Sequence, residues 1–188
     1  MTTPADPRRR AGRRTLVLIA LVALAPFVAS YVAYYGFTRE RQTNYGELLP
    51  TRPAPDIGAT LPDGTPYRLA HGKWLLLFAA PAACDATCAN ALYATRQART
   101  MQNRETARVE RVWLVTDGAT PSPAVLAEHP DITVLRAPAA GLAPFGAGAD
   151  RVYLVDPLGN LVLAYPREPD IKGLAKDVER LLKASRIG

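Results

Sequence analysis

The chain has 188 residues, of which 48% are hydrophobic and 21% are charged, and its formal net charge is +6. This composition excludes an intrinsically disordered chain and a protein that crosses a membrane many times. Two cysteines are too few for a disulfide-rich framework or for a four-cysteine zinc site. The length is sufficient for one ordinary domain with its own buried core.

Most of the positive charge lies at the amino end of the sequence. Residues 1–14, which we predict to form a basic cytoplasmic segment, carry five arginines against one acid. The rest of the chain has 18 Lys and Arg residues against 16 Asp and Glu residues. Because nucleic-acid binding needs a clustered basic face, this nearly neutral body argues against a nucleic-acid partner.

Residues 15–37 predict a single transmembrane helix. They contain no charged side chain, and at about 1.5 Å per residue such a helix crosses a hydrocarbon core of about 30 Å. The preceding arginines predict a cytoplasmic N-terminus and a periplasmic C-terminal domain, with the anchor in the cytoplasmic (inner) membrane. The alternative is a cleavable signal peptide that ends near residues 28–30, but the apolar run continues to Phe37 and favours a retained anchor.

The rest of the sequence predicts a linker and one domain. Residues 38–52 are polar and predict a juxtamembrane linker, and residues 53–188 predict a globular domain. Strands are predicted from continuous apolar runs and hairpin signals, and helices from apolar residues at helical spacing. In chain order, these elements are a strand at 73–79, a helix at 84–104, a strand at 109–116, a helix at 123–128, strands at 132–135, 151–155 and 161–165, and a closing helix at about 170–184.

This order of elements predicts an α/β fold with a mixed central sheet flanked by helices. Strands that alternate with helices favour parallel pairing, whereas the late hairpin predicts antiparallel strands at the sheet edge. Such an order is typical of a thioredoxin-like domain. Residues 139–149 are rich in Ala, Gly and Pro and predict a loop.

The candidate chemistry lies at Cys84 and Cys88. Both follow the first buried strand at the start of the next helix, where sites gather in open α/β sheets. The partial positive charge of a helix N-terminus lowers the pKa of a thiol, although the Asp85 carboxylate opposes a thiolate. On a regular helix the two Cβ atoms would be about 5–6 Å apart. A disulfide needs about 4 Å, so oxidation requires an irregular first turn.

Four interpretations of this pair stay open on the residues alone. The cysteines could form a redox pair in which Cys84 attacks and Cys88 resolves. They could hold a soft ion such as Cu(I). They could also form an inert disulfide of an exported domain, or two buried structural thiols.

Several segments of the domain resemble the Sco/SenC family, the membrane-anchored copper chaperones of cytochrome c oxidase assembly. The resemblance is carried by residues 72–78 before the cysteines, the Cys-x3-Cys pair itself, residues 128–131 and residues 152–160. It implies copper as a bound ion, with Cys84 and Cys88 as metal ligands. It also implies a protein partner, such as a cytochrome oxidase subunit or another copper or thiol protein.

The sequence departs from that family at two points. The family's third copper ligand is a histidine in the loop before the late hairpin, but residues 145–151 contain none. Asp85 also stands where the family usually has a proline. No third ligand is identified elsewhere, because His71 and His129 precede strands and are predicted to be solvated at the opposite end of the sheet.

Two further residues, Met101 and Asp117, lie on elements next to the pair in the predicted fold. Met101 is predicted to pack in the core. Asp117 follows a strand on the cysteine side and could border the site, although a turn role is the simpler prediction.

The sequence therefore predicts a membrane-anchored, outward-facing Sco-like protein that serves cytochrome c oxidase assembly through Cys84 and Cys88. The chemistry would be dithiol redox, Cu(I) transfer or both. One alternative is a general periplasmic thiol–disulfide oxidoreductase, and the sequence offers no other catalytic constellation. The other alternative is a non-catalytic assembly or scaffold protein that has kept the fold and lost the chemistry.

Overall fold

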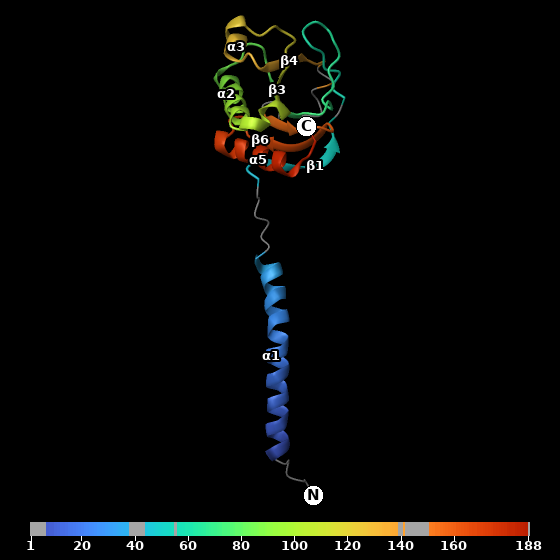
Figure 1. The fold of residues 1–188 in the computed structure, drawn as a ribbon, viewed down its shortest axis with the longest axis vertical. Coiled ribbons are helices and arrows are strands. Elements are labelled where there is room, and N and C mark those ends of the chain that lie inside the picture. Colours follow the sequence, from blue (N-terminus) through green and yellow to red (C-terminus); the bar gives the residue numbers. More distant parts are fainter. Residues whose placement is uncertain (1–6, 38–43, 55, 139–140, 142–150, 188) are drawn as a thin grey trace. The chain divides into compact units, whose positions relative to one another are not determined.

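The computed structural model describes residues 7–37, 44–54, 56–138, 141 and 151–187 (Figure 1). The chain divides into two units, Met1–Thr43 and Asn44–Gly188. The predicted loop at 139–149 lies outside the described residues except for Gly141.

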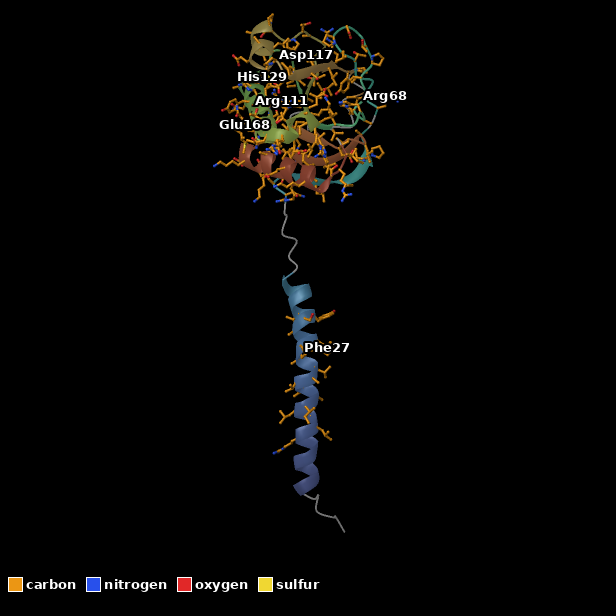
Figure 2. All side chains as sticks on the ribbon, in the orientation of Figure 1. Phe27, Arg68, Arg111, Asp117, His129 and Glu168 are labelled. Atoms are coloured by element: carbon orange, nitrogen blue, oxygen red, sulfur yellow. A yellow bond between two sulfur atoms is a disulfide. The ribbon has the colours of Figure 1, made fainter. Side chains whose placement is uncertain are left out.

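The first unit consists of one long helix, α1 (Pro7–Phe37), which continues through Pro26. The side chains of residues 16–32 are exposed, including the labelled Phe27 (Figure 2). Among the residues whose side chains are described, no helix is both long and apolar enough to cross a membrane.

The second unit is built on a six-stranded mixed sheet with the strand order β1-β6-β5-β2-β3-β4. Strands β2, β3 and β4 run parallel, and β5, β6 and β1 pair antiparallel. The strands are β1 (Glu47–Pro53), β2 (Trp74–Ala80), β3 (Val109–Val115), β4 (Ile132–Arg136), β5 (Val152–Val155) and β6 (Asn160–Tyr165). The helices are α2 (Ala86–Thr100), the 3-10 helix η1 (Asn103–Arg108), α3 (Pro123–Glu128) and α5 (Ile171–Ala184).

Strand β2 lies at the centre because its sequence can be buried on both faces. All seven of its residues are buried. Trp74, Leu76 and Phe78 pack with residues of α2 and α5, and the alternate Leu75 and Leu77 pack in a second cluster on the other face. That second cluster is covered by residues such as Ile57 and Leu69 from the segment before β2. Each buried leucine contributes about 1.5–3 kcal/mol by leaving water.

The amino-terminal part of this unit differs from the prediction. Residues 38–52 were expected to be a linker, but β1 begins at Glu47 and pairs with β6. Residues 38–43 lie outside the described residues. The hairpin strands β5 and β6 are therefore internal, and β1 is the edge, where its prolines are tolerated. The late-hairpin prediction was right about antiparallel pairing and wrong about the edge.

Specific contacts hold the start of this unit on α5. The Gly46 N–H donates to the buried Asp177 carboxylate over 2.8 Å. The Tyr45 hydroxyl accepts from the Asp170 N–H over 2.8 Å, and the Tyr45 ring stacks on Tyr165 with centroids 5.9 Å apart. These long-range contacts explain why a polar segment without a strand-like pattern becomes ordered.

A buried polar cluster joins α2, β3 and the loop before β4 through Arg111. Arg111 and His129 are labelled in Figure 2. The Arg111 side chain on β3 is 0% exposed; it donates to Asp131 over 2.7 Å and to the Leu92 carbonyl over 2.6 Å. His129 is only 6% exposed, so its prediction as a solvated loop residue was wrong. Burial lowers the pKa of His129, and the charges of Arg111 and Arg96 lower it further.

The buried His129 makes stability depend on pH in one direction. Because its pKa in the folded chain lies below that of the unfolded chain, the unfolded chain takes up more protons as pH falls below about 6.5. We expect the free energy of unfolding to fall as the pH falls through that range. In His129→Gln the slope of this free energy against pH should be smaller, by an amount that corresponds to up to one bound proton. Denaturant titrations at a series of pH values measure both slopes, and equal slopes would contradict this account.

Candidate redox site

The site begins where β2 turns into α2. The strand ends at Ala80, and Asp85 is the N-cap of α2, with its side chain accepting from the Cys88 N–H over 2.9 Å. Aspartate is a preferred N-cap because its oxygen pairs a backbone donor that the helix leaves free. Cys84 precedes this cap and has a left-handed backbone, with φ of +42°. The predicted helix at 84–104 was therefore wrong about its start, because α2 begins at Ala86 and leaves Cys84 outside it.

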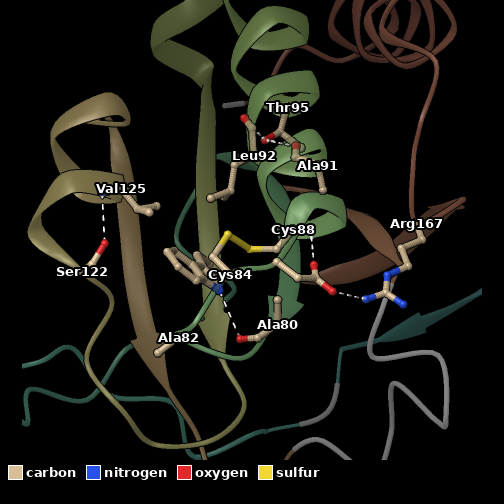
Figure 3. Close-up of a disulfide and its surroundings, with 12 residues drawn as sticks. Ala80, Ala82, Cys84, Cys88, Ala91, Leu92, Thr95, Ser122, Val125 and Arg167 are labelled. Atoms are coloured by element: carbon tan, nitrogen blue, oxygen red, sulfur yellow. Dashed lines mark hydrogen bonds and ion pairs between the residues drawn. A yellow bond between two sulfur atoms is a disulfide. The ribbon is translucent and has the colours of Figure 1, made fainter.

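The left-handed turn brings the two cysteines together as a disulfide (Figure 3). Their Cα atoms are 5.0 Å apart, within the range that a disulfide requires. The irregular start of the helix meets the condition that the cysteine spacing sets for a disulfide. A left-handed conformation at a non-glycine residue costs on the order of 1–2 kcal/mol, so the surrounding contacts have to maintain it.

The two sulfurs differ in access. Cys88 is 2% exposed within the core between β2 and α2, whereas Cys84 is partly exposed and packs at the edge of that core. A reagent from solution can therefore reach Cys84 more readily than Cys88.

The end of β3 holds the segment that leads to Cys84. The Ala80 carbonyl accepts from the Trp113 indole N–H and from the Thr116 N–H, each over 3.2 Å. The Ala82 N–H donates to the Asp117 carboxylate, with 3.2 Å to each oxygen. Asp117 also accepts from the Ala119 N–H, so it forms a turn, as predicted, and borders the site as well.

Charged residues from the loop after β6 lie beside the first turn of α2. Arg167 pairs with Asp85 over 3.3 Å, and the Thr87 hydroxyl donates to Glu168 over 3.3 Å. Sequence reasoning missed both residues of this loop. They are about eighty positions from the cysteines and have no motif of their own.

The described residues supply two sulfurs and no third metal ligand. No group of three His, Cys, Asp or Glu side chains in this part of the chain is placed to hold an ion. His71 lies at the opposite end of β2 and is exposed, as predicted, and its Nε2 is 2.9 Å from the Glu110 carboxylate. Met101 is 49% exposed, so its assignment to the core was wrong. Residues 145–150, where the sequence has no histidine, lie outside the described residues.

A mixed sheet with a disulfide at the junction of its central strand and following helix defines a thioredoxin-like domain. Residues 74–185 match the sequence model of one family, described as "Transmembrane-like, thioredoxin-like, C-terminal domain". Because this match covers more than half of the chain, the chain belongs to that family. A comparison with curated proteins found no match.

Solved structures share this fold. Apo Sco1 from Thermus thermophilus is 23% identical, with a TM-score of 0.56 over 76% of this chain and 96% of that one. Yeast Sco1 with copper bound is 20% identical, with a TM-score of 0.55 over 76% of this chain and 94% of that one. The thioredoxin domain of a thiol-disulfide oxidoreductase from Bacteroides vulgatus is 18% identical, with a TM-score of 0.51 over 71% of this chain and 99% of that one. The predicted resemblance to Sco proteins is thus confirmed as a likeness of fold.

Proposed function

We propose that this chain carries out thiol–disulfide exchange with a partner protein through Cys84 and Cys88. The observation that carries the proposal is the pairing of one partly exposed and one buried cysteine in a disulfide at the β2–α2 junction. An inert disulfide does not need one sulfur within reach of a partner. The fold of the Bacteroides vulgatus oxidoreductase domain lends further support.

The exchange has two steps. In the reduced chain, the Cys84 thiolate attacks one sulfur of a partner disulfide, which forms a mixed disulfide and releases one partner thiolate. The Cys88 thiolate then attacks the Cys84 sulfur, which forms the Cys84–Cys88 disulfide and releases the second partner thiolate. The partner gains two electrons and the chain loses two, and the reverse sequence oxidises a partner dithiol.

This order of attack can be tested with glutathione disulfide as a defined probe. The reduced Cys88→Ser chain should form a stable mixed disulfide with glutathione at Cys84. The matched Cys84→Ser chain should react at least about tenfold more slowly, because its remaining thiol is buried. Mass spectrometry of quenched samples measures both rates, and a faster reaction at Cys88 would contradict the assignment.

A second candidate is Cu(I) transfer in cytochrome c oxidase assembly. It is favoured by the proximity of the two cysteines, whose Cα atoms are 5.0 Å apart, since soft thiolates select Cu(I) when the pair is reduced. The fold shared with yeast Sco1, a protein solved with copper bound, agrees with it. Copper would be cargo here, and a partner such as an oxidase subunit would supply a third ligand.

Cu(I) titration of the reduced full chain against a chromogenic chelator tests this candidate. We expect one ion per chain and at least about a tenfold weaker affinity in Cys84→Ser, which lacks one of two ligands. Absent binding, or affinity unaffected by the substitution, would contradict copper transfer. A strain with both cysteines changed to serine should assemble its oxidase poorly. Normal assembly would contradict any role of the cysteines in oxidase assembly and leave the scaffold alternative for that process.

We further propose that α1 anchors the chain in the cytoplasmic membrane, with the thioredoxin-like domain in the periplasm. The exposed apolar side chains of residues 16–32 and the arginines before them support this placement, as does the family's description.

Alkaline washing of membranes tests the anchor. The full chain should stay with the membrane pellet, and a variant that lacks residues 15–37 should be released, because a peripheral protein loses its attachment under this treatment. Release of the full chain would contradict the proposal.

A further inference from the structure

We infer that Asp117 is a positioning residue for Cys84: its carboxylate fixes the turn that sets the attacking sulfur against its resolving partner. The inference rests on the proposed thiol–disulfide exchange and adds a residue to that site. Asp117 is far from the cysteines in sequence and belongs to the loop after β3 (Figure 2).

The contact is directed at the backbone between β2 and Cys84. Both Asp117 oxygens are 3.2 Å from the Ala82 nitrogen, and Ala82 is only 5% exposed. Within the described residues, Asp117 is the one acceptor that this N–H has. A buried donor without an acceptor is costly, so loss of the carboxylate would drive the Ala82 peptide toward another orientation.

The peptide of Ala82 controls the backbone of Cys84. The Cys84 N–H donates to the Pro81 carbonyl over 3.2 Å, which closes a tight turn across Ala82 and Ala83. The left-handed conformation of Cys84 persists only while this turn is held from outside. The Ala80 carbonyl accepts from Trp113 and Thr116, so the chain is held at Ala80 just before the turn and at Ala82 within it.

The positioning role predicts an effect on the redox equilibrium itself. In Asp117→Ala, the effective concentration of Cys84 toward Cys88 should fall about tenfold, in line with the loss of a hydrogen bond to a charged acceptor. For a two-electron couple this fall raises the reduction potential by about 30 mV. Asp117→Asn keeps an oxygen acceptor for Ala82, so it should stay within about threefold of the unmodified chain.

The matched control is Asp156→Ala. The Asp156 carboxylate also accepts two backbone N–H groups, from Leu158 over 2.9 Å and Asn160 over 2.7 Å. It follows β5, whose carboxyl end lies at the amino end of β2, away from the disulfide. This substitution should lower stability without moving the redox equilibrium.

Equilibration of the full chain in mild detergent with glutathione buffers measures the equilibrium, and denaturant titration measures stability. An unchanged equilibrium in Asp117→Ala, or equal shifts in the Ala and Asn variants, would overturn the inference. Failure of the unmodified chain to exchange with glutathione would instead contradict the proposed function.

A second test needs no substitution and measures the rate of hydrogen exchange at the Ala82 amide of the unmodified chain. We expect this amide to be protected in both the oxidised and the reduced chain, and unprotected exchange would overturn the inference.

Discussion

The chain has to pass from a buried strand to a helix between Ala80 and Ala86, and this junction is the constraint on which the site depends. In this turn the backbone takes Cys84 into the left-handed region and places it against Cys88. Three hydrogen bonds from the end of β3 hold the approach to the turn, and the Asp85 cap fixes where the helix starts. None of these contacts uses a sulfur atom. We therefore expect the turn to keep its geometry when the disulfide is reduced, which prepares the dithiol for the next exchange.

The rest of the second unit serves to fix this junction in place. Helices α2 and α5 pack on one face of β2 and the segment before β2 covers the other, so the strand has no freedom to shift. The buried Arg111 on β3 joins α2 to the loop before β4, because it donates hydrogen bonds to the Leu92 carbonyl and to Asp131. The two sulfurs therefore differ in access: the core covers Cys88, and Cys84 stays partly exposed just before the first turn of α2. Arg167 and Glu168 contact that turn at Asp85 and Thr87.

Elements whose identity depends on local pattern were predictable from sequence. Strand β2 and helix α5 were each placed to within one residue at either end, because a doubly buried strand is a continuous apolar run and an amphipathic helix repeats its apolar residues. Features that depend on distant partners were not. Strand β1 forms because it pairs with β6, and His129 is buried because it packs near Arg111. The Ala82 N–H is bonded by Asp117, which is thirty-five positions away in the sequence. The cysteine pair was found from its position after β2, but the left-handed Cys84 was not, since that conformation follows from the turn as a whole.

The reduction potential of the Cys84–Cys88 pair tests the central claim most directly, because it separates a working disulfide from a structural one. It is measured by equilibrating the full chain with glutathione or dithiothreitol buffers and counting free thiols. An exchange site with a partly exposed attacking sulfur should have a potential above about −300 mV. A potential below that value would show that the disulfide is a structural bridge and would contradict the account.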